Sequence, residues 1–181
     1  MNEIYVYHVV TEKPMILGQK IVFNEKHHNG VYNRVMTCKK ILDGENPQSD
    51  LADFIKLDLN KWTSVTFREL ALEQVRRKEY PFYPSRMSCL YTSRTLEDAK
   101  NWSEFFHQIG RKVYSIVKMK VVGRIFEGDA CNCFDGTNSE EDNLKKSRHY
   151  WRNDYPTDKP IIETLVDGKI TVIEIVHDFH Q

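Results

Sequence analysis

The stretch LYTSRTLEDAKNW, residues 90–102, predicts a short strand that passes directly into a capped helix. Aromatic and β-branched residues favour extended backbone in its first part. Thr95 then stands three residues before Asp98, where its hydroxyl can cap the first turn of a helix. Apolar residues follow at helical spacing, and Gly110 is placed to end the helix. Residues 112–122 alternate in polarity and predict the next strand, so one helix connects two strands here.

Further strands are predicted on both sides of this unit. Residues 4–10 are rich in β-branched and aromatic side chains, and residues 20–23 form a second short run of the same kind. Near the other end of the chain, apolar runs at 161–166 and 169–176 flank the dipeptide Asp167-Gly168. An Asp-Gly pair between two apolar runs is a strong signal for a β-hairpin. The strands therefore lie at both ends and in the middle of the chain.

Two more helices are predicted from capping signals. Thr66-Phe-Arg-Glu69 has the pattern of a capping box and predicts a helix from Thr66 to about Tyr80. Ser139-Glu-Glu-Asp142 has a related pattern and predicts a helix that ends near Trp151. Residues 24–50 are polar and poorly periodic, and they predict a long loop with at most one short helix.

The order of these elements predicts an α+β fold with a mixed, mainly antiparallel sheet and two to three helices packed on it. The regular alternation of strands and helices that builds a doubly wound sheet is missing, and the chain has no glycine-rich dinucleotide fingerprint or phosphate loop. Its 181 residues are 40% hydrophobic and 29% charged. This length and composition predict a single globular domain over residues 1–181.

Net charge and targeting signals bear on the partners and the location of the protein. The chain has 26 Lys and Arg against 26 Asp and Glu, so its net charge does not indicate a partner such as nucleic acid. The N-terminus lacks a basic segment followed by an apolar one, and no apolar run approaches the ~20 residues that cross a bilayer. We therefore expect a cytoplasmic protein with no membrane partner. The pair Cys131 and Cys133 lacks a second pair, so we expect reduced thiols and no metal.

Three segments, taken together, resemble the ADP-ribosyltransferase superfamily. The first is Tyr7-His8-Val9-Val10-Thr11 with Ile16-Leu17-Gly18-Gln19-Lys20-Ile21 behind it, similar to the start of the rifampin-type and DNA-modifying members. The second is the strand-to-helix unit of residues 90–102. The third, Ile162-Glu163-Thr164-Leu165-Val166, is similar to the strand that carries the catalytic glutamate in the DNA-modifying members. The chain also resembles an uncharacterised bacterial domain-of-unknown-function family.

The resemblance implies a split β-sandwich that binds NAD⁺ as a substrate and transfers ADP-ribose to an acceptor. The acceptor could be a small molecule, a nucleic acid or a protein, and the oligomeric state is open. Glu163 is the first candidate for the catalytic carboxylate, and Asp129 is a rival because rifampin-type members carry an Asp after the central strand. The implied cofactor-binding residues are His8 at the adenosine-side ribose, Tyr91 against nicotinamide, Arg86 at the pyrophosphate, and Thr11.

Each of these residues also has an ordinary structural interpretation. His8 and Tyr91 could be core residues, Glu163 a polar residue on a half-exposed strand, and Arg86 a member of a structural ion pair. Tyr150-Trp151-Arg152 could form a wall for the acceptor or pack in the core. The alternative function is a catalytically inactive binding module on the same fold.

Overall fold

The structure is a computed structural model that describes residues 3–154 and 157–179, and it has an α+β fold. These residues contain seven strands: β1 (Glu3–Val10), β2 (Lys20–Phe23), β3 (Leu90–Thr92), β4 (Ser115–Val122), β5 (Ile125–Asp129), β6 (Ile162–Val166) and β7 (Gly168–Asp178). They also contain five α-helices: α1 (Gly30–Leu42), α2 (Asp50–Lys56), α3 (Leu59–Glu79), α4 (Leu96–Gln108) and α5 (Glu140–Arg152). A 3-10 turn, Ala130–Asn132, follows β5.

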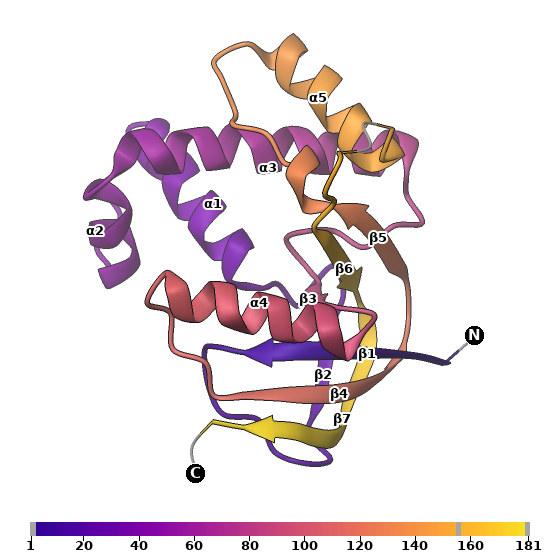
Figure 1. The fold of residues 1–181 in the computed structure, drawn as a ribbon. Helices are drawn as coiled ribbons and strands as arrows, with labels where there is room; N and C mark the ends of the chain where they lie inside the picture. Colours follow the sequence, from indigo (N-terminus) through magenta and orange to yellow (C-terminus); the bar gives the residue numbers. More distant parts are fainter. Residues whose placement is uncertain (1–2, 155–156, 180–181) are drawn as a thin grey trace.

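The strands form two sheets, and every strand pair in the described residues is antiparallel. The larger sheet has the order β1-β4-β7-β2, and the smaller sheet has the order β3-β6-β5 (Figure 1). A bridge between Tyr7 and Ser93 connects the end of β3 to β1. The prediction of an α+β fold built on antiparallel strands is therefore confirmed.

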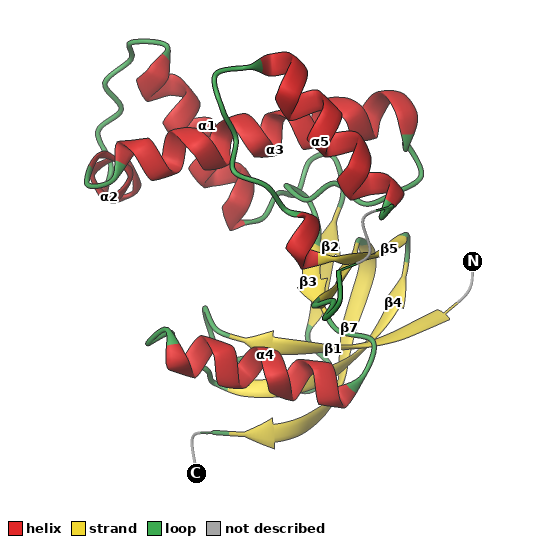
Figure 2. Ribbon diagram, turned by 45° about the horizontal axis from the view of Figure 1, so that its top comes forward, coloured by secondary structure: helices red, strands yellow, loops and turns green. Residues whose placement is uncertain are grey.

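Apolar side chains fill the space between the two sheets. Alternate residues of β1, β4 and β7 meet residues of the smaller sheet there, and the buried members of this cluster are Val6, Val10, Val117, Met119, Val121, Val166, Ile170 and Val172. Helix α4 covers the other face of the larger sheet and lies along β1 (Figure 2). Ala99 of this helix packs there against Val9 and Ile116.

A layer of helices covers the other face of the smaller sheet. Helices α3 and α5 pack on each other and on β5 and β6, with Leu72, Val75, Tyr150, Trp151, Phe126 and Leu165 in one buried cluster. Helix α1 packs beside α3, and α2 lies next to both at the end of the layer (Figures 1 and 2). Burial of this apolar area is the main favourable term that holds the helices on the sheet.

The structure confirms the elements whose ends the sequence marked clearly. The Thr95 hydroxyl accepts a hydrogen bond from the Asp98 amide at 3.1 Å and caps α4. Gly110 follows that helix with φ +74°, a conformation that favours glycine. The Ser139 hydroxyl caps α5 through the Asp142 amide at 3.2 Å.

Two predictions in the helical region are wrong. Residues 24–50 are not a loop with one short helix at most, because α1 extends over thirteen of them. Its cap is Asn29, whose side-chain oxygen accepts from Val31 and Tyr32 amides. The Thr66 to Glu69 pattern is not a helix start either. Helix α3 begins at Leu59 behind the Asp58 cap, so Thr66 and Glu69 lie on its buried side.

The predicted hairpin is also wrong, because β6 and β7 belong to different sheets. The chain crosses from one sheet to the other at Asp167 and Gly168. Gly168 has φ +86°, and a Cβ at this position would lie 2.4 Å from the Val122 carbonyl oxygen at the end of β4. The Asp167 carboxylate accepts from the backbone and the guanidinium of Arg124. The Asp-Gly pair thus marks a close crossing between two sheets rather than a turn within one.

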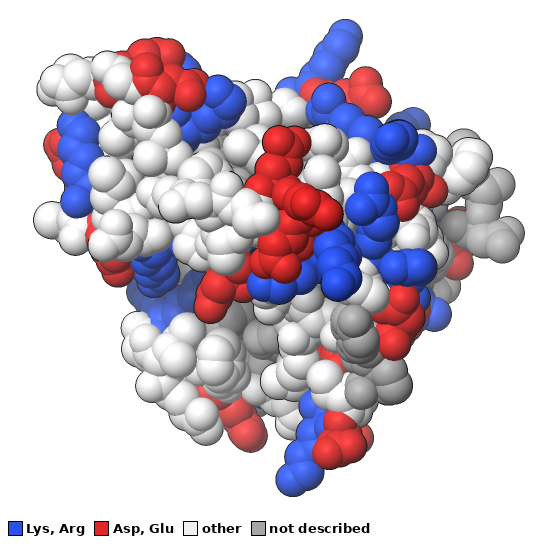
Figure 3. Space-filling view, turned by 90° about the horizontal axis from the view of Figure 1, so that it is seen from above, with Lys and Arg blue, Asp and Glu red and all other residues white. Residues whose placement is uncertain are grey.

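The surface of the helical layer carries both signs of charge. Acidic and basic side chains are interspersed on this face, without one large field of a single sign (Figure 3). Along the described residues, no helix combines the length and the apolar character that crossing a bilayer requires.

Candidate functional site

Glu163 and Tyr91 lie on the same face of the smaller sheet. Residues directly opposite in an antiparallel pair share a face, and alternate residues along a strand share one too. Tyr91 is opposite Leu165, and Leu165 is two residues from Glu163 on β6. Leu165 packs in the cluster under α3 and α5, so this face is the one that the helices cover.

The guanidinium of Arg86 occupies the centre of a buried polar cluster on this face. It comes from the segment between α3 and β3, and it donates to Glu163 Oε1 at 2.8 Å and to Glu69 Oε2 at 3.0 Å. It also donates to the Tyr150 hydroxyl at 2.5 Å, and its central carbon lies 5.4 Å from the Tyr91 ring centroid. Arg86 therefore joins α3, α5, β3 and β6 at one point.

The two carboxylate oxygens of Glu163 have different surroundings. Oε1 accepts from Arg86 and from the Tyr150 hydroxyl, the latter at 2.7 Å. Oε2 accepts no hydrogen bond from the part of the chain that the structure describes. Only 10% of the Glu163 side chain is exposed. The carboxylate is thus fixed through one oxygen, and the other has no hydrogen-bond partner among the described residues.

His8 contacts the backbone of β3, but its side chain shares a face of β1 with Val6 and Val10, which pack between the two sheets, so it does not lie on the helix-covered face with Glu163 and Tyr91. Its Nδ1 lies 2.8 Å from the Tyr91 carbonyl oxygen, and a carbonyl can only accept, so Nδ1 carries the proton. Burial lowers the pKa of His8, although the hydrogen bond to Tyr91 acts in the opposite direction. The imidazole is therefore neutral near pH 7, and its Nε2 is an acceptor.

The electrostatics of the cluster keep Arg86 and Glu69 charged. Burial alone would lower the pKa of Arg86, but the carboxylates of Glu163 and Glu69 outweigh it and raise that pKa well above its usual value. Burial raises the pKa of Glu69, and the guanidiniums of Arg86 and Arg68 overcome this and leave it lowered. Burial raises the pKa of the Tyr150 hydroxyl well above its usual value, so this group stays a donor.

The rival carboxylate, Asp129, is separate from this cluster. It is opposite Ile162 on β6, one residue from Glu163, and therefore faces the other side of the sheet. Its Oδ1 accepts from the Cys131 and Ile161 amides, and its Oδ2 accepts from the Thr157 hydroxyl at 2.5 Å. The carboxylate thus ties the turn after β5 to the segment that leads into β6.

The remaining predicted residues occupy less direct positions. Thr11 lies just after β1 and is partly exposed. All the nitrogens of the Arg86 guanidinium donate to protein groups, the last of them to Glu69 Oε1 at 3.4 Å and to the Cys133 sulfur at 3.8 Å. This arrangement leaves no donor of Arg86 aimed at a pyrophosphate. Tyr150 and Trp151 are both 1% exposed, so they pack in the core instead of forming an acceptor wall.

Glu69 is a partner of Arg86 that was not among the predicted residues. Glu69, Leu72, Glu73 and Arg76 follow the i, i+3, i+4, i+7 spacing of one helical stripe, and all four are buried. Charged residues on an apolar stripe are the signal that could have indicated a buried ionic cluster, because such residues are seldom buried without partners.

The fold and the site together define a protein with two antiparallel sheets under a helical layer, and with a buried ionic cluster where the two meet. Residues 6–178 match the model of a family described as protein of unknown function (DUF2441), and the chain belongs to this family. No curated protein matches the chain.

Proposed function

We propose that the chain binds NAD⁺ and transfers ADP-ribose from it to an acceptor, with Glu163 as the carboxylate beside the reacting ribose. The observation that supports this most directly is the difference between the two Glu163 oxygens. Oε1 is held by Arg86 and Tyr150, and Oε2 accepts nothing from the described residues. A carboxylate fixed in this way is ready to accept a hydrogen bond from a ribose hydroxyl at Oε2.

The chemistry needs such a carboxylate because the bond between ribose and nicotinamide breaks with its electron pair leaving on nicotinamide. Positive charge then grows on the ribose, as it does in glycoside hydrolysis. Glu163 would stabilise that charge and hold the sugar through its 2′-hydroxyl. A nucleophilic atom of the acceptor then bonds to the anomeric carbon and gives up its proton.

The neighbours of Glu163 would have positioning roles. Arg86 and Tyr150 set the orientation of the carboxylate from behind. The ring of Tyr91 supplies an aromatic surface for nicotinamide, and Nε2 of His8 could accept from a ribose hydroxyl on the adenosine side. In this proposal Arg86 orients Glu163 and does not bind the pyrophosphate.

One observation favours the second candidate function, a catalytically inactive binding module. The Glu163 carboxylate is already paired with a guanidinium, and both side chains are about nine-tenths buried. A carboxylate neutralised in this way stabilises a developing cation less than an unpaired one does. The two functions differ in whether nicotinamide is released.

The test is to incubate the protein with NAD⁺ and to measure released nicotinamide by chromatography. We expect release by the unmodified protein and a decrease of at least about 100-fold in Glu163→Gln, since glutamine keeps the shape but not the charge. Glu127→Gln is the matched control, because Glu127 is an exposed carboxylate on the neighbouring strand β5 and on the opposite face. It should release nicotinamide at the unmodified rate.

Two results would contradict the proposal. Unchanged release in a folded Glu163→Gln protein would remove Glu163 from the chemistry, and loss of release in Asp129→Asn alone would transfer the role to Asp129. No heat of NAD⁺ binding at millimolar concentration, measured by titration calorimetry, would favour the binding module. Thermal unfolding of each variant separates a loss of activity from a loss of fold.

A further inference from the structure

A groove lies between α1, α3 and the side chains of Ser85, Met87 and Ser88, and none of the residues predicted to bind NAD⁺ lines it. It consists of two adjoining hollows of about 620 and 350 Å³. Both are lined by Tyr32, Glu73, Arg77 and Met87, so they form one continuous space, which we name the α1–α3 groove. Hollows of this size are typical of sites for small molecules.

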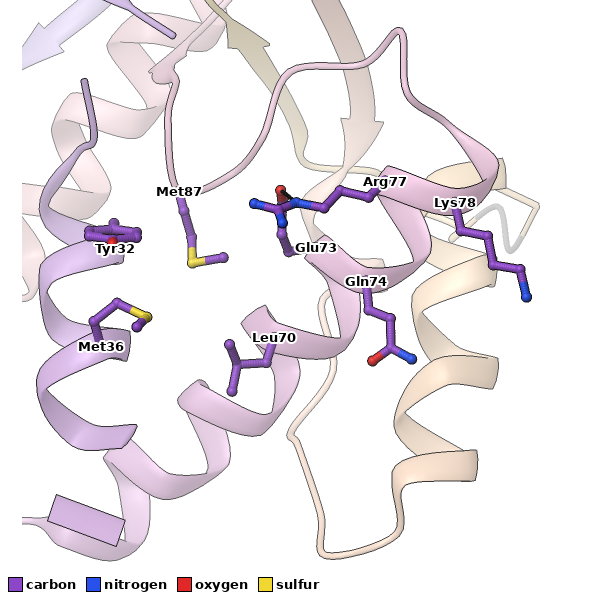
Figure 4. Close-up of a pocket in the computed structure, with 8 residues that line it drawn as sticks. All are labelled: Tyr32, Met36, Leu70, Glu73, Gln74, Arg77, Lys78 and Met87. Carbon is purple, nitrogen blue, oxygen red and sulfur yellow. Dashed lines mark hydrogen bonds and ion pairs between the residues drawn. The ribbon is translucent and has the colours of Figure 1, made fainter. Parts of the chain in front are cut away.

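One end of the groove is apolar. Tyr32 and Met36 from α1, Leu70 from α3 and Met87 from the segment before β3 surround a common space (Figure 4). Methionine side chains are flexible and polarizable, so they adapt to flat rings and irregular apolar groups. This end therefore suits the apolar part of a ligand.

The other end is polar and is built around His28 and Ser88. His28 Nδ1 lies 2.6 Å from the Ser88 hydroxyl oxygen, and Ser88 is only 7% exposed. The His28 ring stacks on Tyr32 with a centroid distance of 3.7 Å and an angle of 14° between the ring planes. The stack makes a flat wall that leads from the apolar end to the polar end.

Basic side chains outnumber carboxylates along the groove. Arg76, Arg77, Lys78 and Arg124 line it, against Glu25 and Glu73. Arg76 holds Glu73 through two hydrogen bonds of 2.9 and 2.8 Å. Burial raises the pKa of Glu73, but the hydrogen bonds from Arg76 and Arg77 outweigh it and leave the pKa lowered. Glu73 is therefore a charged carboxylate whose charge is offset by Arg76. Asp167 likewise offsets Arg124.

Arg77 has donors to spare at the point where the two hollows adjoin. Its Nε donates to Glu73 Oε1 at 2.8 Å, but its two terminal nitrogens have no partner among the described residues. Its side chain is 75% exposed and reaches over Glu73 toward Met87 (Figure 4). Two parallel N–H groups of a guanidinium match the geometry of a phosphate or a carboxylate.

We propose that the α1–α3 groove binds a small molecule in which a flat apolar body carries an anionic group. The apolar body lies at the methionine end against Tyr32, and the anion lies at Arg77 beside His28. This inference does not rest on NAD⁺ binding, and its test contains no NAD⁺.

The test uses 1-naphthyl phosphate as the probe and protein labelled with ¹³C at the methionine methyl groups. We expect the probe to shift the methyl signals of Met36 and Met87 and to leave that of Met119, which is buried between the sheets. Substitutions Met36→Leu and Met87→Leu assign the signals. The probe should bind at least about tenfold more tightly than either 1-naphthol or inorganic phosphate, since only the probe fills both ends.

The variant Arg77→Gln should weaken binding of 1-naphthyl phosphate by about tenfold and leave 1-naphthol unaffected. Arg111→Gln is the matched control, because Arg111 is an exposed arginine outside the groove, and it should bind the probe normally. The proposal is overturned if Met36 and Met87 do not shift or if Met119 shifts as much as they do. Equal affinity for naphthol and its phosphate, or unchanged affinity in Arg77→Gln, would also overturn it.

Discussion

His8 shows how one buried side chain should make stability depend on pH. In the unfolded chain, the imidazole binds a proton as the pH falls through its ordinary pKa of 6.5. In the folded state the pKa is lowered, so the imidazole is still neutral at that pH. The unfolded state then binds more protons, so the free energy of unfolding decreases as the pH decreases below 6.5. Below the folded-state pKa, both states are protonated and the contribution is lost.

The variant His8→Asn should remove this dependence. The asparagine amide can still donate to the Tyr91 carbonyl, but it cannot titrate. Between pH 6.5 and 5 we expect the slope of the unfolding free energy against pH to decrease, by up to about 1.4 kcal/mol per pH unit. Urea unfolding at several pH values measures the slope. His27→Asn, at an exposed histidine, is the control, and an equal change there would refute the role of His8.

The residues of the candidate site could be named from the sequence, but their grouping could not. Motif order indicated Glu163, Tyr91 and Arg86, and these three do meet. Glu163 and Asp129 face opposite sides of the smaller sheet, and this separation follows from strand register. Register is set by partners far away in the chain, so no local pattern contains it.

At the scale of elements, the sequence was informative wherever a cap or a breaker acts locally. Thr95 and Ser139 mark the starts of α4 and α5 because each hydroxyl bonds an amide three residues away. The same type of pattern at Thr66 was misleading, since Glu69 turns to Arg86 and Thr66 is buried inside α3. The helix begins instead at Leu59, where the Asp58 carboxylate accepts from the Lys61 amide at 3.2 Å.

The crossing from β6 to β7 gives a prediction for an element. Gly168→Ala should destabilise the fold by at least about 2 kcal/mol, because φ is +86° and the new Cβ would approach the Val122 carbonyl oxygen to 2.4 Å. Gly44→Ala is the matched control, since Gly44 has φ +87° but nothing within 4 Å of the added Cβ. It should cost only about 1 kcal/mol for the backbone conformation. Equal losses in urea unfolding would show that the close contact with β4 is unimportant.

At the scale of the whole molecule, Arg86 is the point where the helical layer is joined to the smaller sheet. Glu69 belongs to α3, Tyr150 to α5 and Glu163 to β6, and all three bond the same guanidinium. Apolar packing brings these layers together without fixing their relative position closely. We infer that the directional hydrogen bonds of Arg86 set that position, and with it the orientation of Glu163.

Arg86→Met should therefore destabilise the protein strongly, by about 3–5 kcal/mol, because it leaves the buried Glu163 carboxylate without its cation and Glu69 with Arg68 alone. Arg94→Met, which breaks the exposed pair with Glu127, is the control and should change the unfolding free energy by less than about 1 kcal/mol. Adding Glu69→Gln and Glu163→Gln to Arg86→Met should recover much of the lost free energy of unfolding, because the buried carboxylate charges are then removed. If Arg86→Met is no more costly than Arg94→Met in urea unfolding, apolar packing alone holds the helices on the sheet.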